Sequence, residues 1–188
     1  MKKIIAIGGE PATGKSTLIK EFMKTATDWE PMSPVPLING YFSYDYDLAL
    51  LGKYEEGEQF PGTDRFSMAV QPQAEKYLYW LEEMNAPHPN VLFEGDRLFN
   101  AKFLEFCLTL EHLFELHIIL LKASRNQIDF RHKDRKDSQD EKFIKGRRTK
   151  YENIKANFAL SPYIETWMNE TPEDLIINSN KLTVLLRN

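Results

Sequence analysis

The residues with the clearest chemical meaning run from Gly9 to Ser16, where the sequence reads Gly-Glu-Pro-Ala-Thr-Gly-Lys-Ser. This is the G-x-x-x-x-G-K-[ST] spacing of a phosphate-binding loop. Glycines let the backbone wrap closely around a polyphosphate with its N–H groups turned inward. Lys15 would reach the β- and γ-phosphates of a nucleotide, and the Ser16 hydroxyl would bind Mg²⁺. The sequence therefore predicts a nucleoside-triphosphate site with ATP and Mg²⁺ as cofactors. Its expected phosphate contacts are Gly9, Ala12, Thr13, Gly14, Lys15, Ser16 and Thr17.

A second group of reactive side chains, Glu94-Gly-Asp-Arg97, directly follows the apolar run Val91–Phe93. Glu94 can hold Mg²⁺ through water, so Ser16 and Glu94 are the expected metal ligands. Asp96 could orient or deprotonate an acceptor hydroxyl, while Arg97 neutralises phosphate charge. The alternative is that Asp96 and Arg97 form a plain surface ion pair.

A basic segment from Lys122 to Lys155 holds twelve Lys/Arg against six Asp/Glu, in a chain whose net charge is −4. Such a block favours an anionic ligand at one face, either ATP alone or ATP together with a nucleic acid. Arg125 is expected at the ATP phosphates, and Arg131 and Arg135 are expected to close over the transferred group. The alternative is a solvated charged helix.

Residues 41–65 mix aromatic side chains, glycines and acidic residues without a clean period. Beside a nucleotide site, such a segment is typical of an acceptor-binding insertion. We name Tyr41 and Asp45 as candidate acceptor contacts. The alternative, a surface loop held by its aromatic residues, stays open.

The order of predicted elements indicates how these residues are positioned. Strands separated by helices imply crossover connections and a parallel sheet with helices on both faces, and the ligand then lies at the carboxyl ends of the strands. We predict an α/β phosphate-loop fold of the nucleotide-kinase type, with three layers and about five strands. Residues 1–188 form one domain, with the insertion at about 40–70 and an arginine-rich lid at about 125–150. The predicted strands are 4–7, 35–38, 91–93, 116–121 and 175–177.

Composition and missing motifs narrow the class of protein to which the chain can belong. The chain has 188 residues, 42% of them hydrophobic, as in an ordinary soluble globule, and no apolar run of membrane-spanning length. We expect a cytoplasmic protein, in the host cytoplasm if a phage encodes it. A GTPase would need Asn-Lys-x-Asp, and Asn180-Lys-Leu-Thr183 lacks the aspartate. A small kinase fits, because it needs the carboxylate after the third predicted strand, the lid and the acceptor segment.

Two resemblances follow from these motifs. The phosphate loop, Val91–Gly95 and the basic segment through Gly146-Arg147 resemble nucleoside and nucleoside-monophosphate kinases. More narrowly, four short motifs resemble bacteriophage 5-hydroxymethyluracil DNA kinases, which phosphorylate the base's hydroxymethyl group within DNA. The motifs are Leu51–Tyr54, Gly62–Met68, Gln71-Pro72 and Phe93–Asn100. This resemblance implies that Asp64 and Arg65 lie near the acceptor.

We therefore expect a kinase that transfers the γ-phosphoryl group of ATP to a nucleotide-like acceptor. The preferred acceptor is a hydroxymethylated pyrimidine in DNA, bound partly through segment 122–155. One alternative is a kinase of free nucleosides or nucleoside monophosphates. The other is a nucleotide-dependent binding protein that is not a kinase.

Overall fold

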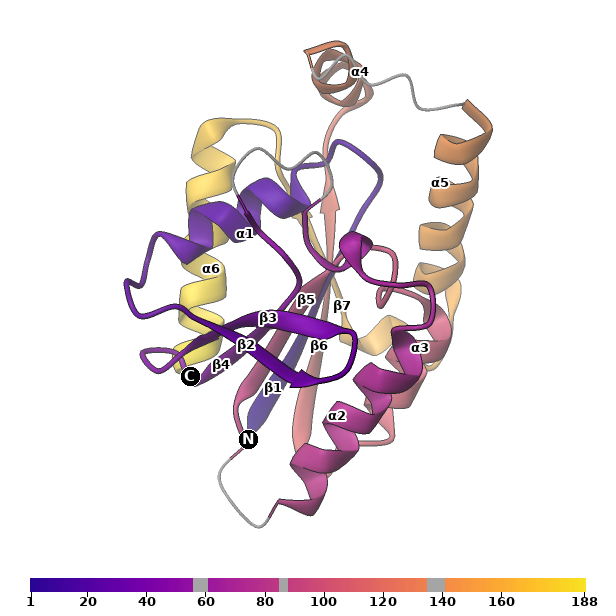
Figure 1. Cartoon of the computed structure of the whole chain (residues 1–188). Coiled ribbons are helices and arrows are strands. Elements are labelled where there is room, and N and C mark those ends of the chain that lie inside the picture. Colours follow the sequence, from indigo (N-terminus) through magenta and orange to yellow (C-terminus); the bar gives the residue numbers. More distant parts are fainter. Residues whose placement is uncertain (56–60, 85–87, 135–140) are drawn as a thin grey trace.

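A computed structural model describes residues 1–55, 61–84, 88–134 and 141–188 of the chain. Within these ranges, one seven-stranded sheet in the order β2-β3-β4-β5-β1-β6-β7 lies between two layers of helices (Figure 1). The strands are β1 (Lys2–Gly8), β2 (Glu30–Val35), β3 (Ile38–Ser43), β4 (Leu48–Leu51), β5 (Asn90–Glu94), β6 (Phe114–Lys122) and β7 (Ile164–Met168). The α-helices are α1 (Lys15–Met23), α2 (Gln71–Glu83), α3 (Ala101–Leu108), α4 (Arg125–Asp134), α5 (Glu141–Ala156) and α6 (Pro172–Arg187). Two short 3₁₀ helices are η1 (Thr63–Arg65) and η2 (Ser161–Tyr163).

Five neighbouring strands, from β4 to β7 in sheet order, run parallel. Ile4–Ile7 of β1 are fully buried, as are all residues of β5. Strands covered by helices on both faces need such continuous apolar runs. The predicted α/β fold with three layers is confirmed, and β2 and β3 add an antiparallel hairpin at one edge.

The helices bury two separate sets of apolar residues against the sheet. On one face, α1 and α6 pack around Ile5, Ile7 and Leu92. On the other face, α2, α3 and the end of α5 cover Ile4, Ala6 and Phe93. Figure 1 shows α1 and α6 together on one side of the sheet and α2 and α3 on the other, with α4 beyond the carboxyl ends of the strands.

The strand predicted at 35–38 is wrong. β2 ends at Val35, Leu37 adopts a positive φ of 67°, and β3 begins at Ile38, so the segment turns a hairpin. The strand neighbouring β5 is instead β4, whose four residues are all buried. A run of four apolar residues carries no period, which is why this segment was predicted to be irregular.

The strand predicted at 175–177 is also wrong, because these residues lie in α6. Thr171 and Asp174 form a capping box, and Pro172 occupies the first turn of this helix. Ile176 and Ile177 are about half exposed. The last strand in the described part of the chain is β7, which follows η2.

The other predicted strands are placed as expected. Strands 4–7, 91–93 and 116–121 lie within β1, β5 and β6. The Ser124 hydroxyl oxygen accepts a hydrogen bond from the Gln127 N–H at the start of α4, and Glu170 accepts one from the Ser124 N–H. No helix in the described part of the chain is both long and apolar enough to cross a membrane.

Two glycines provide a matched test of the packing. A Cβ at Gly8, the last residue of β1, would overlap the buried Phe99 ring, whereas a Cβ at Gly146 in α5 would meet nothing within 4 Å. We predict that Gly8→Ala lowers the free energy of unfolding by about 1–3 kcal/mol through overpacking. Gly146→Ala should raise it by up to about 1 kcal/mol through helix propensity. Urea unfolding measures both, and equal changes in the two variants would contradict the packing described here.

Candidate active site

The segment between β1 and α1 has the backbone that a phosphate-binding loop requires. Gly9 and Gly14 have φ values of 146° and 91°, and Ala12 has a φ of 62°. Gly14 is the N-cap of α1, so the loop opens directly onto a helix N-terminus, which favours anions. The Lys15 Nζ donates to the Gly9 and Glu10 carbonyl oxygens at 2.8 and 3.1 Å. Its ammonium group is thus held at the mouth of the loop.

Two residues that are distant from this loop in the sequence hold it in place. The Asn169 Nδ2 donates to the Thr13 carbonyl oxygen at 2.8 Å, and Arg131 Nη1 donates to that of Ala12 at 3.1 Å. Arg131 also binds the carbonyl oxygens of Asn169 and Glu170. A Cβ on Gly14 would overlap the Asn169 amide. This position therefore needs glycine for packing as well as for its positive φ.

Ser16 and Glu94 meet because β1 and β5 are parallel neighbours. Ile7 pairs with Glu94 in register, and the Ser16 hydroxyl donates to Glu94 Oε1 at 2.9 Å. Burial raises the pKa of Glu94 to about 7, although the charge of Lys15 opposes this shift. Gly62 leaves no space beside this carboxylate, since a Cβ there would overlap Glu94 Oε1.

This pair of oxygen groups fits Mg²⁺. A desolvated carboxylate beside a hydroxyl is stabilised by a nearby cation, and Mg²⁺ prefers oxygen ligands. Among the described residues, no three His, Cys, Asp or Glu side chains form a metal-binding group. The contact between Ser16 and Glu94 makes these two residues the candidate protein ligands, and water and phosphate oxygens would complete the coordination, as is usual for Mg²⁺ in such sites.

Asp64 lies beside this pair on η1, in the segment that follows β4. Its Oδ1 accepts a hydrogen bond of 2.6 Å from the Asp96 backbone N–H. Burial, followed by the negative charge of Asp96, raises the pKa of Asp64 above its ordinary value. The charge of Lys15 partly opposes this shift, so Asp64 is electrostatically coupled to the loop lysine.

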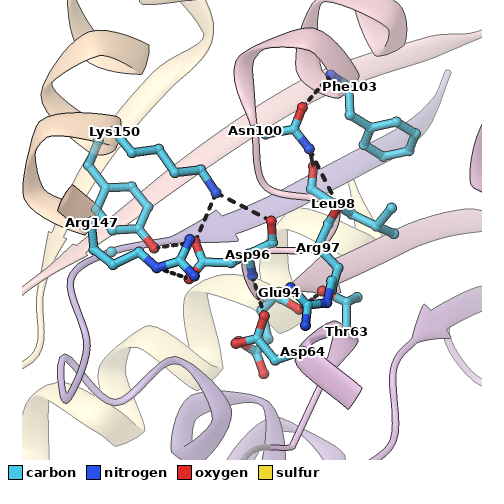
Figure 2. Close-up of polar contacts among 12 residues, drawn as sticks. Thr63, Asp64, Glu94, Asp96, Arg97, Leu98, Asn100, Phe103, Arg147 and Lys150 are labelled. Atoms are coloured by element: carbon cyan, nitrogen blue, oxygen red, sulfur yellow. Dashed lines mark hydrogen bonds and ion pairs between the residues drawn. The ribbon is translucent and has the colours of Figure 1, made fainter. Parts of the chain in front are cut away.

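Asp96 has a different environment from Asp64. Its Oδ1 accepts from Lys150 Nζ at 2.9 Å and from the Tyr151 hydroxyl at 3.1 Å, and its Oδ2 lies 3.0 Å from Arg147 Nε (Figure 2). Burial alone would raise the pKa of Asp96, but Lys150 and then Arg147 lower it below its ordinary value. Asp96 is thus a paired, stably ionised carboxylate.

The catalytic candidate Arg97 and the acceptor candidates Arg65 and Tyr41 differ in position. Arg97 Nε donates to the Phe66 carbonyl oxygen, and Arg65 pairs with Glu55. The Tyr41 ring centroid lies 6.4 Å from that of Tyr54. Burial, and then the charge of Glu94, raises the pKa of Tyr54 well above its ordinary value, so Tyr54 borders the site.

Asp45 does not join this group. It lies in the turn between β3 and β4, at the amino edge of the parallel strands, where its N–H donates to Asp28. Because parallel strands end at the opposite edge, the phosphate loop and Asp45 are separated by the length of the sheet.

Several side chains of the basic segment bind acidic residues of this same chain. Arg148 binds Glu10 of the phosphate loop, Arg147 and Lys150 bind Asp96, and Arg125 pairs with Asp129 within α4. Thr17 is exposed on the first turn of α1. Arg135 lies outside the described residues.

Several residues of the site were missed from the sequence. They are Glu10, Arg148, Lys150, Tyr151, Asn169 and Thr63, whose hydroxyl donates to the Glu94 carbonyl oxygen. Lone polar residues of this kind carry no spacing signal, and Asn169 follows a strand that the sequence did not predict.

The fold and the site together define a phosphate-loop protein of the kinase type. A family model described as P-loop Nucleotide Kinase3 matches residues 1–177, and the chain belongs to this family. The family indicates a phosphotransferase. No curated protein matches the sequence.

Two solved structures show a distant likeness to this chain. A shikimate kinase from Bacteroides thetaiotaomicron is 14% identical with a TM-score of 0.47, covering 99% of each chain. A gluconokinase from Sinorhizobium meliloti 1021 is 11% identical with a TM-score of 0.45, covering 98% of this chain and 95% of that chain.

The raised pKa of Glu94 predicts how stability depends on pH. In metal-free buffer, its protonated form stabilises the fold fully below the ordinary pKa of 4.5, and this contribution is lost as pH rises through about 7. Glu94→Gln should abolish it, so the wild type should lose roughly 2–3 kcal/mol more than the variant between pH 5 and 8. Urea unfolding in EDTA measures this, and excess Mg²⁺ should shrink the difference. Parallel pH profiles for the two proteins would contradict the burial of Glu94.

Proposed function

We propose that the protein transfers the γ-phosphoryl group of ATP to a hydroxyl group of a nucleotide-like acceptor, with Mg²⁺ as cofactor. The observation that carries this proposal is the convergence of Lys15, Glu94 and Asp64 at the carboxyl edge of the sheet. The lysine and the helix N-terminus can bind the phosphates of the donor, and the second carboxylate, Asp64, can bind the hydroxyl group of the acceptor.

On the donor side, the loop amides and Lys15 bind and orient the polyphosphate. Ser16 and Glu94 hold Mg²⁺, which neutralises phosphate charge when bound. Arg148 forms an ion pair with Glu10 of the phosphate loop. When ATP is bound, its guanidinium group can bind a phosphate oxygen in place of this carboxylate.

On the acceptor side, we assign the general base to Asp64 rather than Asp96. A base must accept a proton, and the pKa of Asp64 is raised, whereas that of Asp96 is lowered by its pairing with Lys150 and Arg147. The acceptor hydroxyl oxygen forms a bond to the γ-phosphorus while the bond to the leaving ADP oxygen breaks. Asp64 takes the hydroxyl proton.

For the acceptor, we propose the 5-hydroxymethyl group of a modified pyrimidine in DNA. The motifs behind the sequence resemblance are distant in the chain but adjacent in space. Asp64 accepts from Asp96, Arg97 donates to Phe66, and Asn100 donates to the Gln71 side chain. These contacts bring the motifs at 62–68, 71–72 and 93–100 to one wall beside Asp64, which is where an acceptor base would bind.

A specific observation favours the alternative, a kinase of free nucleosides or nucleoside monophosphates. Arg147, Arg148 and Lys150 bind carboxylates of this same chain, so they do not form an outward track for a DNA backbone. DNA would then depend on exposed lysines such as Lys133 and Lys145.

Acceptor identity can be tested by incubating the protein with γ-labelled ATP, Mg²⁺ and a panel of acceptors. The panel contains DNA with 5-hydroxymethyluracil, unmodified DNA, free nucleosides and nucleoside monophosphates. We expect label in the hydroxymethylated DNA, none in unmodified DNA, and transfer that weakens steeply with salt. Label in free nucleosides or monophosphates would replace this acceptor with the alternative. Label only in inorganic phosphate would favour a nucleotide-dependent protein that is not a kinase.

The base assignment predicts that Asp64→Asn lowers the transfer rate by about 10²–10⁴ while ATP binding is retained. Single-turnover transfer measures the rate, and Asp45→Asn is the matched control at the far edge of the sheet, where no loss is expected. If Asp64→Asn costs less than about fivefold and Asp96→Asn costs far more, Asp96 is the base.

A further inference from the structure

The lid helix α5 is attached to the core in two different ways along its length. Toward its end, Tyr151 and Ile154 are buried in the apolar core, and the Tyr151 ring lies 5.8 Å from that of Phe99. Before Tyr151, the residues from Ile144 onward are half-buried or exposed. We call residues 144–150 the earlier half of the helix, and the contacts described for it are the polar ones of Arg147, Arg148 and Lys150.

Two carboxylates of the core receive these polar contacts. Asp96 binds Lys150 and Arg147, with side-chain exposures of 14%, 22% and 25%. Glu10 binds Arg148, with exposures of 27% and 48%. Exposed pairs contribute little, whereas removing one partner of a largely buried cluster is costly because the other charges remain unpaired. The Asp96 cluster therefore dominates the docking of the earlier half of α5.

Asp96 also contacts the proposed base through its backbone. Its N–H donates to Asp64 Oδ1 while its side chain binds α5 (Figure 2). One residue thus connects α5 with Asp64, the carboxylate to which we assign the role of general base.

We propose that Asp96 is a positioning residue: it clamps the earlier half of α5 onto the core and couples docking of this lid helix to the orientation of Asp64. The coupling to Asp64 rests on the proposed function, whereas the clamp does not. If docking of α5 orders Asp64 in this way, it also favours transfer to the acceptor over loss of the phosphoryl group to water.

Amide hydrogen exchange of the free, full-length protein tests the clamp without nucleotide or acceptor. In Asp96→Asn, amides of residues 144–150 should exchange at least about tenfold faster than in the wild type. Amides of 152–156, held by Ile154, and of β1 should be unchanged. The matched control is Glu152→Gln, the same carboxylate-to-amide change on the exposed side of α5, which should leave all segments at wild-type rates.

A second variant keeps the test decisive if Asp96→Asn does not fold. Lys150→Gln removes a partner that lies on α5 itself, and it should accelerate exchange over 144–150 in the same way. Wild-type exchange over 144–150 in a folded variant would overturn the clamp, as would uniform acceleration that includes β1.

The coupling to Asp64 is read separately, as the ratio of phosphate released into water to phosphate transferred. This ratio should rise severalfold in Asp96→Asn and Lys150→Gln. An unchanged ratio alongside faster exchange would overturn the coupling and leave the clamp standing. If the protein transfers no phosphate to any acceptor, the proposed function fails and the exchange result still stands.

Discussion

The parallel pairing of β1 with β5 is the constraint on which the site depends. It sets Ile7 opposite Glu94, so the loop that follows β1 and the carboxylate that ends β5 meet at one edge, with Ser16 and Glu94 in hydrogen-bond contact. Apolar side chains on both faces fix the register of these strands, because they are buried under helices on each side. The chemical groups are therefore positioned by the most buried part of the molecule.

Three carboxylates share the site, and their different environments shift their pKa values in different directions. Glu94 is buried beside a hydroxyl and is suited to a cation, whereas Asp96 is ionised by the lid residues that it binds. Asp64 has a raised pKa and accepts a hydrogen bond from the Asp96 backbone N–H. Neighbouring acids whose pKa values are pushed apart can take different roles in one reaction. Here the separation arises from burial and from Lys150 and Arg147, not from the residue types.

Much of this arrangement could be predicted from the sequence, because it depends on local signals. The loop spacing defined Lys15 and Ser16, and Glu94 followed from the rule that ligands bind where parallel strands end. Long-range contacts could not be predicted in this way. Asn169 reaches Thr13 across 156 residues, and Lys150 reaches Asp96 across 54. The segment Leu175–Ile177 was misread because its branched side chains suggest a strand, while the capping box at Thr171 starts a helix. Asp45 was predicted to contact the acceptor because it lies in a segment rich in aromatic and acidic residues. The turn that contains it lies at the amino edge of the parallel strands, opposite the phosphate loop.

Nucleotide binding is the central claim, and titration calorimetry tests it most directly. The wild type, titrated with ATP in the presence of Mg²⁺, should bind one nucleotide per chain, and Lys15→Ala should bind it at least about tenfold more weakly because the loop loses its cation. Removal of Mg²⁺ should weaken binding to the wild type far more than binding to Glu94→Gln. If the folded wild-type protein binds neither ATP nor GTP with Mg²⁺ present, the phosphate-loop site described here is contradicted.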